Sequence, residues 1–271
     1  MTPTRRNQRA LRTAGAGAAA LLALSACSSS GSDSSSAKPD SSASGRLSGT
    51  VTVFAAASLQ ESFTTLGKQF ERAHPGTKVT FSFGGSDSLA ASITGGAPAN
   101  VFASASPKTM KIVTDAGDAS GRPVTFARNQ LEIATLPGNP HRVGSLKDLT
   151  DKDLKVVLCA AEVPCGAAAQ KALAASRLKL TPVSYEQDVK AALTKVELKE
   201  ADAAVVYKTD VHAAGDKVEG VEFPESADAV NDYPITLLKG TQDTETAKAF
   251  IALVRSAEGR KVLTGAGFLK P

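Results

Sequence analysis

Two turns in this sequence combine small residues with a serine at the point where a strand pattern gives way to a helix pattern. They are Phe54–Ser58, with the sequence FAAAS, and Phe83–Ser86, with the sequence FGGS. Small side chains let a ligand approach the backbone, and the free N–H groups and dipole at a helix start favour an anion. One such serine is usually only a helix cap. A third turn, Val163–Ala167, opens a helix in the same way, so the three turns together favour an anion-binding cradle.

Other chemistry at these residues is less favoured. The three histidines, His74, His141 and His212, are far apart and have no ligand partners beside them, so no metal site is predicted. A serine hydrolase with Ser58 or Ser86 as nucleophile remains a remote alternative, because the GGSDS stretch lacks the second glycine of a GxSxG elbow. A structural adhesin is a weaker alternative still.

Strand and helix patterns alternate from Thr50 onward. Ser58 with Glu61 three residues later fits a capping box at the start of the first helix. We expect strands near 51–54, 79–83, 101–103, 131–136, 155–160, 203–207 and 233–238, and helices near 58–73, 86–94, 166–173, 188–198 and 244–254. This alternation predicts an α/β fold with mostly parallel sheets, in which ligands lie beyond the carboxyl ends of the strands.

The N-terminal region has the features of a secretory signal peptide over residues 1–26. Four arginines are its only ionisable side chains, and a short run of Ala, Gly and Leu follows them. Leu24–Cys27 resembles the lipobox of bacterial lipoproteins, which implies a lipid on Cys27; a plain secreted protein is the alternative. Residues 27–46 are rich in serine and are predicted to be a flexible tether.

The charge and cysteine counts bear on partners and compartment. The whole chain has 31 Lys and Arg against 27 Asp and Glu, a formal charge of +4. Removal of residues 1–26 takes away four arginines and leaves 27 against 27, which argues against nucleic acid as a partner. Outside the cytoplasm, Cys159 and Cys165 are predicted to form a disulfide, with two free thiols as the alternative.

Six stretches, in order, resemble the periplasmic molybdate-binding proteins of ABC importers, a group of type II solute-binding proteins, here in lipoprotein form. They are VTVFAAASL, FSFGGSDSLA, GGAPANVFASA, EVPCG, EQDVKAAL and AAVVY. The resemblance implies a two-lobed α/β fold, each lobe a mixed, mostly parallel sheet flanked by helices, with the ligand in a cleft between them. By the same resemblance, lobe one covers 47–128 plus 232–271 and lobe two covers 129–231.

The resemblance also implies the residues that bind the oxyanion. These are the hydroxyls of Ser58, Ser86 and Tyr207 and the backbone amides of Cys165 and Val189. The implied ligands are molybdate and tungstate, with sulfate or phosphate as the alternative. A shell of donors alone favours an anion without a proton. A carboxylate that faces the anion would repel it, so we expect Asp87 to point away from the ligand; an inward Asp87 would favour phosphate instead.

A binding protein of this kind is not an enzyme and needs no cofactor. The resemblance implies a monomer that delivers its ion to the permease of an ABC importer with its ATPase. The lipid on Cys27 would hold it at the outer face of the cytoplasmic membrane, and no nucleic acid partner is expected.

Overall fold

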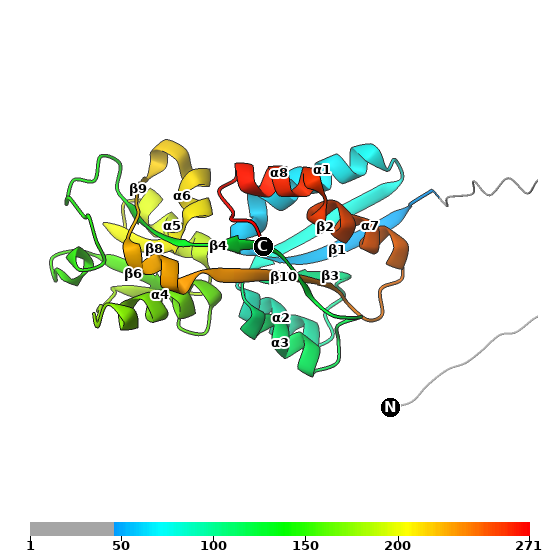
Figure 1. Cartoon of the computed structure of the whole chain (residues 1–271), viewed down its shortest axis with the longest axis horizontal. Coiled ribbons are helices and arrows are strands. Elements are labelled where there is room, and N and C mark those ends of the chain that lie inside the picture. The colour runs from blue at the N-terminus through cyan, green and yellow to red at the C-terminus, as the bar shows by residue number, and fades with distance from the viewer. Residues whose placement is uncertain (1–45) are drawn as a thin grey trace, which may run out of the picture. The chain divides into compact units, whose positions relative to one another are not determined.

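The computed structural model describes residues 46–271, which form one compact unit with two five-stranded sheets (Figure 1). The predicted signal peptide, the lipidation site Cys27 and all but the last residue of the predicted tether lie outside the described residues. No helix in the described part is both long and apolar enough to cross a membrane.

The first sheet has four strands in one direction and one opposed to them. β1 pairs in parallel with β2 and β3, whereas β10 is antiparallel to β3 and to β4. In spatial order the strands are β2 (Thr77–Gly84), β1 (Gly49–Ala56), β3 (Val101–Ala103), β10 (Asn231–Leu237) and β4 (Val124–Asn129).

Helices cover both faces of this sheet, and together they form what we call the first lobe. Figure 1 shows α1, α7 and α8 on one face and α2 and α3 on the other. Their bounds are α1 (Gln60–Ala73), α2 (Ser86–Thr94), α3 (Pro107–Asp115), α7 (Thr244–Arg255) and α8 (Ala257–Gly265). Phe63, Leu66 and Phe70 lie on the buried face of α1, as their helical spacing predicts.

The second sheet repeats the arrangement and, with its helices, forms the second lobe. β6 is parallel to β7 and β8, whereas β5 is antiparallel to β8 and β9. In spatial order the strands are β7 (Ser184–Glu186), β6 (Val156–Cys159), β8 (Ala203–Tyr207), β5 (Leu131–Thr135) and β9 (Glu219–Val221). The helices are α4 (Pro164–Ala175), α5 (Val189–Glu197) and α6 (Lys208–Ala214), with short 3-10 turns at Asp148–Thr150, Gly215–Lys217 and Pro224–Ala229.

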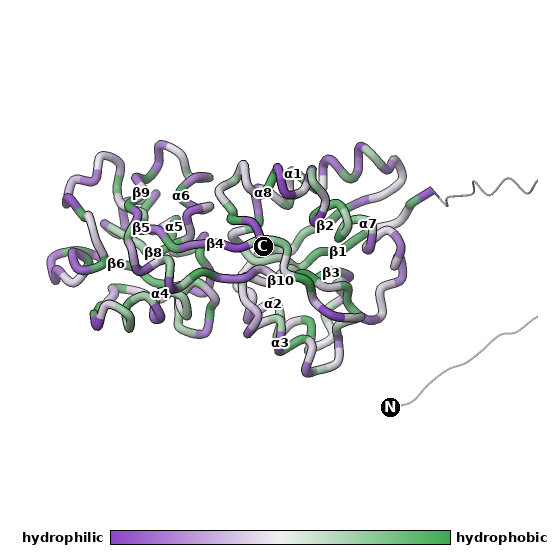
Figure 2. Tube along the Cα trace, in the orientation of Figure 1, coloured by the Kyte–Doolittle hydropathy of each residue, from purple (hydrophilic) through white to green (hydrophobic). Residues whose placement is uncertain are grey.

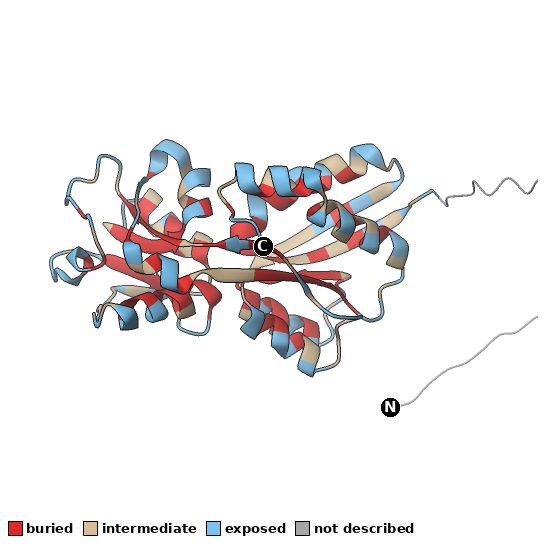
Figure 3. Ribbon diagram, in the orientation of Figure 1, coloured by how far each residue is buried: buried red, intermediate tan, exposed pale blue. Residues whose placement is uncertain are grey.

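The predicted fold class is confirmed. Four of the five strands in each sheet share a direction, and helices flank both sheets. Hydrophobic residues follow the strands, and the hydrophilic ones lie mainly along the outer helices and loops (Figure 2). The strands are accordingly the most buried part of each lobe (Figure 3).

The chain crosses between the lobes twice. It leaves β4 at Asn129 and enters β5 at Leu131, and it returns between Val221 of β9 and Asn231 of β10. Asn129 and Asn231 are register partners in the antiparallel pair β4–β10, so the two crossings lie side by side. The lobe boundaries given above remain a prediction.

The predicted capping box at Ser58 is wrong. Ser58 lies inside a 3-10 turn, Ala57–Leu59, and α1 begins after it at Gln60 without a side-chain cap. The Ser58 hydroxyl instead lies 2.8 Å from the hydroxyl of Tyr233 on β10. The Ser58 hydroxyl therefore contacts a side chain that is distant in the sequence and does not cap the backbone of α1.

Candidate functional site

A small cavity lies where the two lobes meet, with a volume of about 10 Å³, close to the room that one water molecule needs. All five residues predicted to bind the anion line it. The lining residues are Ala56, Ala57, Ser58, Gly84, Gly85, Ser86, Ala105, Val163, Pro164, Cys165, Asp188, Val189 and Tyr207.

The first lobe brings its two serines together through strand register. β1 and β2 are parallel neighbours, and their last pair is Ala56 with Gly84. The turns that follow these residues therefore leave the same edge of the sheet, as expected for parallel strands. Ser58 and Ser86 are both buried, at 4% and 1% exposure.

Three helices begin at this cavity. α2 starts at Ser86, α4 at Pro164 and α5 at Val189, and the residue before each start also lines the cavity. The first N–H groups of a helix have no partner within it and carry the positive end of its dipole. Helix starts from both lobes thus place partial positive charge around one small volume.

Each of the three hydroxyls at the cavity has a protein neighbour. Ser86 Oγ accepts a hydrogen bond from the N–H of Ala105 at 3.0 Å. Tyr207 Oη accepts one from the side-chain amide of Asn231 at 2.7 Å. Ser58 Oγ and Tyr233 Oη lie 2.8 Å apart, and either oxygen is able to donate.

Sequence reasoning missed Tyr233, Asn129 and Asn231. Tyr233 contacts the hydroxyl of Ser58, and Asn231 contacts that of Tyr207. Asn129 is fully buried and donates to Tyr233 Oη at 3.3 Å. None of the three lines the cavity itself. No local signal in the sequence marks them, because their partners are distant along the chain.

The two tyrosines remain neutral donors. Burial raises the pKa of Tyr207 well above its ordinary value, and nearby Tyr233 and Asp210 add to the rise. Burial also raises the pKa of Tyr233, against hydrogen bonds from Ser58 and Asn129 that lower it. Both side chains therefore keep their protons across the physiological range.

Two carboxylates near the cavity behave differently. Asp87 is not among the lining residues, and the expectation that its carboxylate points away from the ligand stays a prediction. Asp188 does line it, and sequence reasoning did not single out this residue. Its Oδ1 accepts the N–H of Ala191 at 2.9 Å, so the carboxylate serves as the N-cap of α5.

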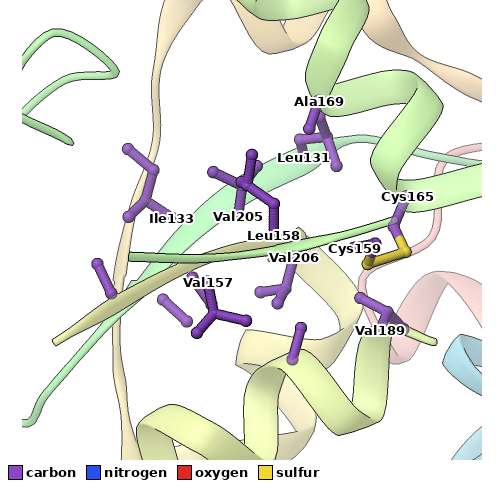
Figure 4. Packing of buried hydrophobic residues seen from close by; sticks show 14 of the residues in the cluster. Leu131, Ile133, Val157, Leu158, Cys159, Cys165, Ala169, Val189, Val205 and Val206 are labelled. Carbon is purple, nitrogen blue, oxygen red and sulfur yellow. A yellow bond between two sulfur atoms is a disulfide. The ribbon is translucent and has the colours of Figure 1, made fainter. Parts of the chain in front are cut away.

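A disulfide joins Cys159 to Cys165, as predicted, with 5.8 Å between their Cα atoms. It links the end of β6 to the first turn of α4, beside Val189 (Figure 4). A Cβ on Gly166 would overlap with the backbone oxygen of Ala160, so this turn is tightly packed. The backbone of Cys165 is thus fixed on one side by the disulfide and on the other by helix packing.

Cationic side chains are kept away from the cavity. Among its lining residues, all of them in the described part of the chain, there is no Lys, Arg or His. Residues 46–271 also contain no group of three or more His, Cys, Asp or Glu side chains placed to hold a metal ion. The site offers neutral donors, which suit an anion rather than a cation.

One lysine instead joins the lobes behind the site. Lys190 Nζ on α5 lies 2.9 Å from Glu61 on α1 and 3.2 Å from the buried Asp210 on α6. Burial raises the pKa of Asp210 to about 6, although Lys190 acts to lower it. Burial acts to lower the pKa of Lys190, but the two carboxylates outweigh it and raise that pKa.

The chain matches known proteins over nearly all of its described length. Residues 51–269 match the family model described as bacterial extracellular solute-binding protein. The molybdate-binding protein ModA of Mycobacterium tuberculosis is 44% identical over 238 residues, which cover 87% of this chain and 91% of that protein.

Two solved structures share the fold. The periplasmic molybdate-binding protein of Azotobacter vinelandii superposes with a TM-score of 0.70 at 22% identity, covering 82% of this chain and 99% of that one. The sulfate-binding protein SubI of Mycobacterium tuberculosis gives 0.69 at 17% identity, covering 81% and 86%. Because these two proteins are described as binding different anions, the fold alone does not determine the ligand.

Proposed function

The chain belongs to the family of bacterial extracellular solute-binding proteins, and from this we propose that it captures molybdate, and also tungstate, for an ABC importer. Proteins of this family bind solutes for transport outside the cytoplasm and are not enzymes. The expected location and role therefore follow from the family, whereas the ion is our proposal. Its support from sequence is the 44% identity to a protein described as molybdate-binding.

The observation that carries the proposal is the convergence of neutral donors on one small cavity. Two serine hydroxyls, a tyrosine hydroxyl and three helix starts surround it. An anion loses hydration when it is buried and must recover that free energy from donors. Hydrogen bonds to a charged group contribute about 1.5–3 kcal/mol each, so several of them replace a buried cation.

The small volume and the donors narrow the choice of ligand. The cavity is small and is lined by small residues and neutral donors, which suits a compact oxyanion. Sulfate and phosphate are the rivals in this class. Hydrogen phosphate needs an acceptor for its proton; in the Asp188 carboxylate, which belongs to a lining residue, Oδ1 already accepts from Ala191.

The binding residues come from both lobes, which suggests how capture works. In our proposal Ser58 and Ser86 hold the ion from the first lobe, and Cys165, Val189 and Tyr207 hold it from the second. Only the closed arrangement offers all five donors, so the ion shifts the equilibrium between open and closed forms. The closed form then docks on the permease, and the ATPase drives release.

The remaining details of the proposal concern anchoring and assembly. A lipid on Cys27 and a tether over residues 27–46 would hold a monomeric binding domain at the outer face of the cytoplasmic membrane. Mass spectrometry of the protein purified from membranes tests the lipid, through the mass added to the peptide that begins at Cys27.

Calorimetry tests the ligand. The purified protein is titrated with molybdate, tungstate, sulfate and phosphate under the same buffer conditions. We expect tight binding of molybdate and tungstate and weak binding of the other two. Tight sulfate or phosphate binding without a molybdate signal would contradict the proposal.

A further inference from the structure

We propose that Tyr233, Asn129 and Asn231 are positioning residues that fix the direction of the hydrogen bonds behind the cavity, so that Ser58 and Tyr207 point their protons at the ion. This inference rests on the proposed function and adds to it the residues that orient two of the proposed donors. It depends on three backbone groups that have only one possible role in a hydrogen bond. The N–H groups of Gln130 and Ala105 only donate, and the carbonyl of Pro164 only accepts.

The first fixed group is the N–H of Gln130. It donates to Oδ1 of Asn129 at 3.0 Å, which sets the orientation of the Asn129 amide. The Nδ2 of Asn129 therefore faces two hydroxyls, Thr209 at 2.8 Å and Tyr233 at 3.3 Å. Because Nδ2 only donates, Tyr233 Oη must accept from it.

The direction of the next hydrogen bond follows. Tyr233 Oη accepts from Asn129, so its own proton is free for Ser58 Oγ at 2.8 Å. Ser58 Oγ then accepts on the protein side, and its proton turns toward the cavity that it lines. The two hydrogen bonds from Asn129 to Tyr233 and from Tyr233 to Ser58, which we call the relay, thus leave the Ser58 hydroxyl as a donor toward the cavity.

The second fixed group is the carbonyl of Pro164. It orients the side chain of Asn231, which in turn contacts Tyr207. Asn231 Nδ2 lies 3.3 Å from this oxygen and 2.7 Å from Tyr207 Oη. A carbonyl oxygen only accepts, so the amide nitrogen of Asn231 is the atom on this side, and Tyr207 accepts from it. Tyr233 is a second acceptor for the Tyr207 proton, and in our proposal the bound ion takes that proton instead.

The third fixed group is the N–H of Ala105. It acts directly on Ser86, with no side chain between them, and makes the Ser86 oxygen an acceptor on the protein side. It donates to Ser86 Oγ at 3.0 Å, and the serine proton is left for the cavity. Ser58 and Ser86 are therefore each left with a proton for the cavity, and the proton of Tyr207 has Tyr233 and the ion as possible acceptors. Each hydroxyl oxygen already accepts one hydrogen bond from the protein, which favours donation to the ion over acceptance from it.

Asn129 and Asn231 both lie where the chain crosses between the lobes, and both can be changed to aspartate in the same way. Asn129 and Asn231 are register partners at the two chain crossings, one behind each lobe's hydroxyl. Asn→Asp at either site keeps the shape but replaces the donor with an acceptor. Tyr233 or Tyr207 would then donate to the new carboxylate, and Ser58 or Tyr207 would present oxygen to the ion.

The experiment measures the dissociation constants of molybdate and phosphate at pH 8 for Asn129→Asp and Asn231→Asp. We expect molybdate affinity to fall about tenfold or more in each, the effect of one hydrogen bond to a charged group. Phosphate, present as the monohydrogen ion, gains an acceptor, so the ratio of phosphate to molybdate affinity rises at least about tenfold. Asn100→Asp is the matched control, because Asn100 Oδ1 also accepts a backbone N–H but lies away from the cavity.

Loss of molybdate affinity without a change in the ratio would overturn the proposal, since added negative charge alone weakens both ions. If an aspartate variant does not fold, Tyr233→Phe is measured with Ser58 intact and with Ser58→Ala. We expect Tyr233→Phe to weaken molybdate binding severalfold only when Ser58 is present; equal losses in both backgrounds would contradict the relay. Failure of the wild-type protein to bind any oxyanion would instead contradict the proposed function.

Discussion

The backbone oxygen of Gln187 lies so close to Gly85 that a Cβ on this glycine would overlap with it. Gly85 precedes α2 in the first lobe, and Gln187 precedes the N-cap of α5 in the second. The backbone of Gly85 has an ordinary conformation, with φ −60° and ψ 132°, which any residue adopts. The glycine is therefore required by the approach of the lobes and not by its own backbone.

We expect Gly85→Ala to weaken ion binding by about tenfold or more, because overpacking costs about 1–3 kcal/mol and here acts only on the closed form. Small-angle scattering should show a more open molecule in the presence of ion, and calorimetry should give the affinity. Gly144→Ala is the control, since its Cβ would meet nothing closer than 3.8 Å. Unchanged affinity in Gly85→Ala would show that the lobes bind the ion without this approach.

Removal of either serine hydroxyl at the cavity is expected to weaken binding. Ser58→Ala and Ser86→Ala should each cost about 1.5–3 kcal/mol of binding free energy, the value of a hydrogen bond to a charged group. Calorimetry checks this, with Ser92→Ala as control, because the Ser92 hydroxyl donates to the backbone oxygen of Ser88 on an exposed face. Full affinity in both cavity variants would exclude these serines from the binding site.

Loss of the disulfide is expected to affect stability and binding together. Replacing Cys159 and Cys165 by serine opens a short loop, which should lower the free energy of unfolding by about 2–3 kcal/mol. Binding should also weaken, because the backbone of Cys165 lines the cavity. Urea unfolding and calorimetry measure the two effects. Wild-type protein treated with a reductant should match the variant; a reduced protein with full stability and affinity would argue against a role for the disulfide.

The buried Asp210 is expected to make stability depend on pH. Burial raises its pKa from 3.8 to about 6, so the folded protein holds this proton more tightly than the unfolded chain. The free energy of unfolding should therefore fall by about 3 kcal/mol from this group as the pH rises from below 4 to above 6. The change levels off once Asp210 is ionised in both states.

The measurement compares urea unfolding of the wild type and Asp210→Asn between pH 4 and pH 8. The difference, wild type minus variant, should decline with rising pH up to about 7 and then stay constant. This comparison cancels the other carboxylates, which titrate in both proteins. A difference that does not change with pH would mean that Asp210 titrates normally in the folded protein.

Much of the fold was predictable because the strand and helix patterns are local. The turns after β1 and β2, and the helix starts at Ser86 and Val189, follow from short stretches of sequence. The identity of Cys165, Val189 and Tyr207 as cavity residues came from the resemblance to a known family, since each would otherwise be read as an ordinary core residue. The structure brings all of them to one cavity.

The groups behind the cavity were not predictable from sequence. Tyr233 is 175 positions from Ser58 and 104 from Asn129, so nothing local connects them. The capping-box pattern at Ser58 failed for the same reason, because a tertiary hydroxyl competes for the serine. Short elements such as β7 and β9, of three residues each, also carry too few side chains to give a pattern.

The absence of a lysine or arginine from the cavity lining has a consequence for the molecule as a whole. With residues 1–26 removed, the chain carries 27 basic and 27 acidic side chains. The lining has no Lys, Arg or His to offset an arriving dianion, so we expect the loaded protein to be more negative than the unloaded one. Isoelectric focusing under native conditions should therefore resolve loaded from unloaded molecules as separate bands, and the ratio of the bands reports how much of the protein carries an ion.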